Sequence, residues 1–261
     1  MACGLCQLDR PLVDSHLLPA AAYKLAREPD RQNPNPIVVT PGHAGSSSRQ
    51  ISDEFLCREC EDRFSKRGER YVLAQCARPK GFALRDVLKT LPPLVENERF
   101  KVFDVTVSVG TPVEDYLYFA ASVFWRAAAR CWTLNGQTIQ RLTLGPYEEQ
   151  LRKYLLGELP FPHEVRLFVH VWSEERAGFT SIVPTSGRAP DGTHRHKFTI
   201  PGILFIILVG KTVATEIDAG ALNSNAGSFM WLCPWSKDSL FEGMGALVMD
   251  ALRARRGRRQ P

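Results

Sequence analysis

The chain has 261 residues, of which 44% are hydrophobic and 23% charged. This composition fits a globular protein of one large or two smaller domains and excludes a long disordered chain. No apolar run reaches the roughly 18–20 residues that a membrane helix needs, so we expect no membrane partner. The net charge is +5, and the five arginines of residues 253–261 account for all of it. We therefore expect a neutral body with a basic tail, which either contacts phosphates or is a solvated terminus.

The N-terminal region contains two Cys-x-x-Cys pairs. Cys3 and Cys6 form the first pair, and Cys57 and Cys60 form the second. Two such pairs supply four thiolates at the spacing of a structural zinc site, which predicts one Zn²⁺ on these four residues. The alternative is two unrelated pairs with a redox role. The other three cysteines lie among apolar residues and are expected to be buried free thiols, which favours a reducing, cytoplasmic compartment.

Periodicity and breaker residues predict the remaining elements in chain order. Helices are expected over residues 20–27, from 58 to about 68, and over 116–132, 145–156 and 240–253. Strands are expected over residues 37–40, 99–109, 165–171, 179–183, 196–208 with a break at 201–202, and 211–217. The helix over 116–132 is apolar on nearly every face, so it should be central to its core.

Together these elements predict an α+β protein with two parts. Residues 1–70 would form a treble-clef zinc module, in which the second cysteine pair opens a helix. Residues 71–261 would form a mixed helix and antiparallel-sheet domain that ends in the basic tail. On this division, loss of the metal should unfold the zinc module before it affects the second domain.

The N-terminal motifs resemble a known nuclease module. The pair Cys3-x-x-Cys6, the segment Ser15-His16-Leu-Leu-Pro19 and the segment Leu56-Cys57-x-x-Cys60-Glu61 are similar to a zinc-bearing HNH (ββα-metal) endonuclease module. The resemblance covers residues 3–70, about a quarter of the chain. The whole chain also looks like a group of uncharacterised bacterial proteins that share Leu-Cys-x-x-Cys-Glu-x-x-Phe and a downstream Gly-Glu, here Gly68-Glu69.

The resemblance implies roles for three residues. His16 stands where the family has its general base, and a neutral imidazole accepts a proton from water near pH 7. Glu61 stands where the family has a metal-binding His, and its carboxylate would favour Mg²⁺ or Mn²⁺. Asp53 falls near the family's Asn. The chain departs from the pattern at Ser15, which replaces an acidic or His ligand, a loss for which Asp14 could compensate.

The resemblance implies metal-dependent hydrolysis of nucleic-acid phosphodiesters, with bacterial antiviral defence as a setting by analogy. The alternative is a non-catalytic zinc finger that binds nucleic acid or a protein partner. A third interpretation is a structural zinc clip on an unrelated ligand-binding domain. On the two non-catalytic interpretations, His16 is a structural histidine and Glu61 is a carboxylate at the start of a helix.

Two further groups of polar residues indicate structural settings more than chemistry. Arg126 and Arg130 lie four apart, which favours an exposed edge or internal ion-pair partners over a phosphate site. His194 and His196 would share one face of a strand, and without a third ligand in sequence an exposed strand edge is the expected setting. Ser186, with Ser181 and Asp191, forms no recognisable hydrolase motif.

Overall fold

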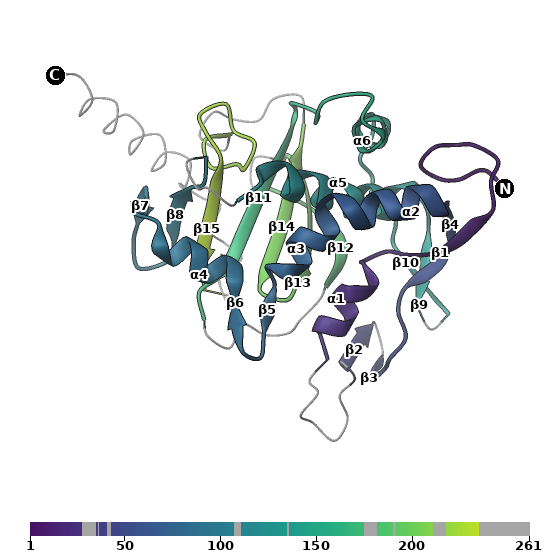
Figure 1. Ribbon diagram of the computed structural model, residues 1–261, viewed down its shortest axis with the longest axis horizontal. Helices are drawn as coiled ribbons and strands as arrows, with labels where there is room; N and C mark the ends of the chain where they lie inside the picture. Colours follow the sequence, from purple (N-terminus) through teal and green to yellow (C-terminus); the bar gives the residue numbers. More distant parts are fainter. Residues whose placement is uncertain are drawn as a thin grey trace.

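A computed structural model of the chain describes residues 1–27, 35, 37–40, 43–106, 111–134, 136–174, 182–189, 192–210 and 218–234. Figure 1 shows a central sheet with the helices packed along it and with the N-terminal hairpin at one end of the molecule. The predicted strand over residues 211–217, the predicted helix over 240–253 and the basic tail lie outside the described residues. Within the described part, no helix has both the length and the apolar character needed to cross a bilayer.

The main sheet has seven strands in the order β12-β13-β14-β11-β15-β8-β7. Its strands are β7 (Val95–Glu96), β8 (Lys101–Asp104), β11 (Val165–Trp172), β12 (Ile182–Arg188), β13 (His194–Ile200), β14 (Ile203–Val209) and β15 (Phe229–Cys233). All neighbouring strands are antiparallel except β11 and β15, which run parallel. The predicted mixture of helices and sheet is therefore confirmed, but the sheet is mixed and not purely antiparallel as predicted.

Four two-stranded antiparallel sheets lie outside the main sheet. They are β1 (Leu12–His16) with β4 (Ser52–Cys57), β2 (Ile37–Thr40) with β3 (His43–Ser46), β5 (Ala77–Arg78) with β6 (Gly81–Phe82), and β9 (Trp132–Leu134) with β10 (Gln137–Ile139). The two-stranded sheet of β1 and β4 joins segments that are far apart in sequence, because Leu12 pairs with Cys57 and His16 pairs with Ser52. This pairing brings the two cysteine pairs to the same end of the molecule.

Six α-helices complete the described fold. They are α1 (Ala20–Leu25), α2 (Arg58–Phe64), α3 (Arg70–Ala74), α4 (Ala83–Thr90), α5 (Val113–Ala129) and α6 (Tyr147–Leu156). The segment Ser65–Glu69, here called η1, joins α2 to α3 across a kink. In Figure 1, α2 and α3 run alongside α5, and α6 lies above α5 in this view.

Helix α5 is the centre of the core, as its apolar sequence predicts. It begins three residues earlier than expected, directly after Pro112, and its C-terminal neighbour Arg130 is already extended. On the sheet side, the ring of Phe124 lies 4.9 Å from that of Phe198, and Phe119 lies 5.3 Å from Phe205. Each of these rings buries a large apolar area, so the contacts hold α5 against the sheet.

The N-terminal module and the sheet share one hydrophobic core. The ring of Phe55 on β4 stacks on Trp125 of α5 with centroids 5.4 Å apart, and Phe64 of α2 meets the same indole edge-on at 6.2 Å. A single cluster of buried side chains runs from Cys3 through α5 to the sheet. The division after residue 70 stays a prediction, and the structure adds that the described part of residues 1–70 has no core separate from α5.

Candidate metal centre and adjacent polar cluster

Two local structures present the four cysteines. Cys3 and Cys6 lie on the N-terminal loop, Cys57 ends β4, and Cys60 lies in the first turn of α2. Gly4 allows the loop to approach β4, because a Cβ atom at this position would collide with the ring of Phe55. The loop is then fixed by backbone bonds, from Gly4 N–H to the Phe55 carbonyl at 3.0 Å and from Gln7 N–H to the Cys3 carbonyl at 2.9 Å.

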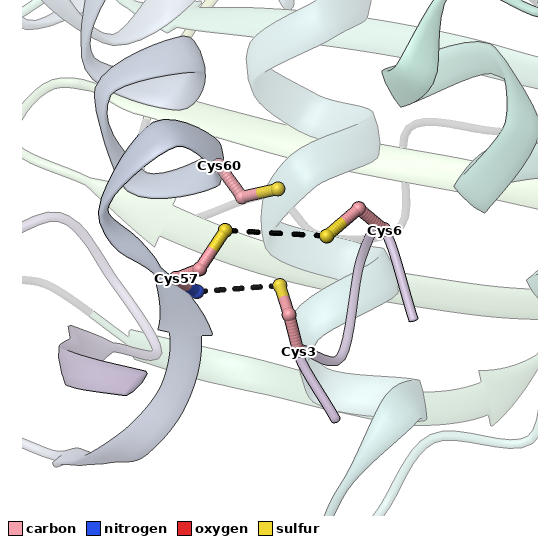
Figure 2. Close-up of side chains that lie close together, drawn as sticks. All are labelled: Cys3, Cys6, Cys57 and Cys60. Carbon is pink, nitrogen blue, oxygen red and sulfur yellow. Dashed lines mark hydrogen bonds between the residues drawn. The ribbon is translucent and has the colours of Figure 1, made fainter. Parts of the chain in front are cut away.

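The four sulfur atoms face one another, as Figure 2 shows, and all lie within 4.8 Å of one another. The Sγ atoms of Cys6 and Cys57 are 4.0 Å apart. A tetrahedral ion with metal–sulfur bonds of about 2.3 Å would separate its sulfurs by about 3.8 Å. The cluster therefore fits a metal ion such as zinc. Within the described residues it is the one group of three or more His, Cys, Asp or Glu side chains that meets this distance.

The environment of the cluster favours thiolate at one position. Hydrogen bonding with Cys60 lowers the pKa of the Cys3 thiol to about 4, and raises the pKa of Cys60 in return. The backbone N–H of Cys57 also donates to Cys3 Sγ, at 3.2 Å. Metal binding requires deprotonated sulfur, so a site that already stabilises one thiolate is prepared for a cation.

His16 ends β1 opposite Ser52, at the far end of the strand pair from Cys57, and is partly exposed. Its imidazole lies 6.4 Å from the ring of Tyr23, centroid to centroid. Its main-chain carbonyl accepts a hydrogen bond of 2.8 Å from Nη1 of Arg126 on α5. The backbone at His16 is therefore held by a residue 110 positions further along the chain.

Glu61 lies in the first turn of α2. Its Oε2 atom is buried and has no hydrogen-bond partner. Burial raises the pKa of the Glu61 carboxyl, and the charge of Arg126 opposes that rise, as do hydrogen bonding with Ser15 and the charge of His16. Glu61 and His16 thus belong to one polar cluster, which also contains Glu69 and Arg126.

Asp53 does not join this cluster. Its carboxylate forms an ion pair with Arg130 and is half exposed. It also accepts a hydrogen bond of 2.8 Å from the backbone N–H of Glu54. Among the described residues, His16, Glu61 and Asp53 do not converge as a set of three metal ligands.

Arg126 and Glu69 are the residues of the cluster that sequence reasoning did not assign. The interpretation of Arg126 and Arg130 as ion-pair partners is the one that the structure supports, since Arg126 pairs with Glu69 and Arg130 with Asp53. Arg126 is fully buried. The sequence contains one indication that Arg126 is a buried polar residue, because it is the only charged residue between Tyr116 and Ala129.

One of the two histidines of β13, His196, differs from its predicted setting. β13 is an interior strand, and His196 is 1% exposed, so the expectation of an exposed edge is wrong for this residue. Nδ1 of His196 lies 2.9 Å from Oγ of Ser186, its cross-strand neighbour on β12. His194 is exposed. Ser181 and Asp191 lie outside the described residues.

Comparison of the chain with protein-family models, with curated proteins and with solved structures finds no match. The function of the chain is therefore inferred from the geometry of the cysteine cluster and of the polar cluster that contains Glu61 and His16.

Proposed function

We propose that the cysteine cluster holds one structural Zn²⁺ in a treble-clef arrangement. The order of elements supports this proposal. A cysteine loop precedes the paired strands β1 and β4, and the second cysteine pair begins α2. Four thiolates fill the coordination sphere of zinc, which leaves no open position for a substrate or water. Chemistry at this end of the protein would therefore use other residues.

The second part of the proposal is that the polar cluster hydrolyses nucleic-acid phosphodiester bonds. The observation that carries it is the unpartnered, buried Oε2 of Glu61 in the same cluster as His16. A carboxylate oxygen without a donor is a suitable ligand for Mg²⁺ or Mn²⁺, which would supply positive charge next to a phosphate. His16 would accept a proton from the attacking water.

Asp53 would have to leave Arg130 to take part, so the proposal assigns the chemistry to His16 and Glu61. With few protein ligands, the divalent ion would keep several waters, as Mg²⁺ commonly does. The partner of the protein on this proposal is a nucleic acid.

A second candidate function is a non-catalytic zinc module that binds nucleic acid or a protein. The observation that favours it is the pairing of both neighbouring carboxylates with arginines, Glu69 with Arg126 and Asp53 with Arg130. Of the carboxylates of Asp53, Glu61 and Glu69, only that of Glu61 has no ion pair among the described residues.

A cleavage assay separates the two candidates. Zinc-loaded full-length protein is incubated with labelled single-stranded DNA, double-stranded DNA or RNA in the presence of Mg²⁺, Mn²⁺ or EDTA. Metal-dependent cleavage is expected, and His16→Ala should lower its rate by about 10²–10⁴-fold, the usual contribution of a positioned base. His163→Ala is the matched control, because His163 is exposed and far along the chain. If the wild type cleaves none of the substrates, or if His16→Ala cleaves at the wild-type rate, the hydrolytic proposal fails.

A further inference from the structure

The η1 segment packs closely against α5 at Gly68. Gly68 has φ +84° and ψ −56°, a conformation that side-chain-bearing residues rarely adopt. A Cβ atom at Gly68 would lie 2.8 Å from the Asp115 carbonyl oxygen and 2.9 Å from the Phe119 nitrogen. The Gly68 N–H donates to Oδ1 of Asp115 at 3.0 Å. Glycine at this position therefore permits close contact of the two backbones.

The close packing at Gly68 places the Glu69 side chain next to that of Arg126. The two side chains form an ion pair that is almost closed to solvent, with 12% of the Glu69 side chain and 1% of the Arg126 side chain exposed. The guanidinium also lies 4.7 Å from the ring centroid of Phe64. A buried guanidinium without a carboxylate would be costly, so Glu69 is the residue that allows Arg126 to occupy the core.

Arg126 then connects this ion pair to His16. Nη2 contacts Glu69, and Nη1 donates to the His16 carbonyl at 2.8 Å. The end of α5 is itself anchored, because Nε1 of Trp132 donates to the Arg126 carbonyl at 2.9 Å. A chain of contacts thus runs from the η1 kink through Glu69 and Arg126 to the last residue of β1.

We propose that Arg126, held by Glu69, is the positioning residue for His16, so that the candidate site needs α5 as well as the zinc module. This inference rests on the proposed hydrolytic function and adds two residues outside the catalytic pair. Arg130 provides the comparison on the same end of α5. It makes an equivalent pair of contacts, to Asp53 and to the Glu54 carbonyl at 2.8 Å, but does not reach His16.

The test measures steady-state cleavage by zinc-loaded full-length variants. Arg126→Met should lower kcat by about 10- to 100-fold with KM changed less than about threefold, because a misplaced group loses rate and not substrate affinity. Arg126→Lys should recover part of the loss, and Arg130→Met should behave as the wild type. In a His16→Ala background, Arg126→Met should have no further effect, since both changes act on one group. Additive losses, or an equal loss in Arg130→Met, would overturn the inference.

A second readout decides the inference even if the wild type cleaves nothing, in which case the proposed function fails separately. The ring signals of His16 are followed by NMR in the zinc-loaded wild type, Arg126→Met and Arg130→Met proteins. The signals should shift or broaden in Arg126→Met alone, and unchanged signals would overturn the inference. Zinc content and melting temperature identify variants that fail to fold. For a misfolded Arg126→Met, the isosteric Glu69→Gln takes its place in both measurements with the same expected and contradicting results.

Discussion

The sulfur atoms of Cys6 and Cys57 lie 4.0 Å apart, although the two residues are separated by 51 positions in the chain. Around them, the first cysteine loop is tied to α6, because Nη1 of Arg152 donates to the Leu5 carbonyl at 2.7 Å. Arg63 of α2 likewise donates to the Leu156 carbonyl at the end of α6, at 3.3 Å. The cysteine cluster is therefore part of the packed body and not an appended finger.

Removal of the metal should destabilise the whole protein in a single transition. The expectation from the sequence, that the zinc module unfolds first, does not allow for the core that Phe55 and Trp125 share. We expect chelation, or Cys57→Ser, to cost at least about 3 kcal/mol, which lowers the melting temperature by about 6–12 °C for a chain of this size. Far-ultraviolet circular dichroism and tryptophan fluorescence should report the same midpoint. Cys131→Ser is the matched control, because Cys131 lies outside the cluster and, against the expectation of a buried thiol, is exposed. Two separate midpoints would show that the zinc module unfolds independently.

Replacement of Gly68 should be far more costly than replacement of another glycine with a similar φ. Gly157 has φ +81° and follows α6, and a Cβ atom there would meet nothing within 4 Å. We expect Gly157→Ala to cost about 1 kcal/mol from the left-handed conformation alone. Gly68→Ala adds a backbone collision with α5, so its cost should exceed that of Gly157→Ala by about 1–3 kcal/mol. Urea denaturation of the zinc-loaded proteins measures both values, and equal costs would mean that η1 does not press on α5.

The buried His196 should make stability fall in mild acid. Burial, with a smaller contribution from the charge of His194, lowers the pKa of His196 from 6.5 to about 4. Because protonation is disfavoured in the fold, the stabilising contribution is complete above pH 6.5 and is lost as the pH falls toward 4. A pKa difference of this size corresponds to about 3 kcal/mol.

The wild type and His196→Asn, both zinc-loaded, are compared by urea denaturation at intervals from pH 7.5 to 4.5. The wild type should lose stability more steeply, because Asn does not titrate and other acid effects are common to both proteins. Parallel curves would show that His196 is protonated as readily in the folded protein as in the unfolded chain.

Local patterns predict the parts of the fold that depend on neighbouring residues. The spacing of the two Cys-x-x-Cys pairs is sufficient to predict the cysteine cluster, because each knuckle closes within one short turn of chain. The continuous apolar run of α5 and the short apolar run of β14 likewise predict a central helix and a buried strand. The parallel pairing of β11 with β15 has no such signal, since these strands lie far apart in the sequence.

The candidate site is only partly predictable for the same reason. His16 and Glu61 flank the cysteine pairs in sequence, whereas Glu69 meets Arg126 across 57 positions. Asp53 is a candidate site residue because it lies shortly before Cys57 in the sequence, but its carboxylate pairs with Arg130. The expectation of an exposed strand edge for His196 is wrong because β13 pairs with β12 on one side and with β14 on the other, which the spacing of the two histidines does not indicate.

Zinc K-edge X-ray absorption on full-length protein purified without added metal tests the four-thiolate centre. We expect one zinc per chain with four sulfur neighbours at about 2.3 Å and no oxygen or nitrogen bound to the ion. Cys60→Ser should lose the ion or replace one sulfur neighbour with a lighter atom. Absence of zinc from the wild type, or a first shell containing nitrogen or water oxygen, would contradict a closed four-thiolate centre and with it the assignment of catalysis to His16 and Glu61.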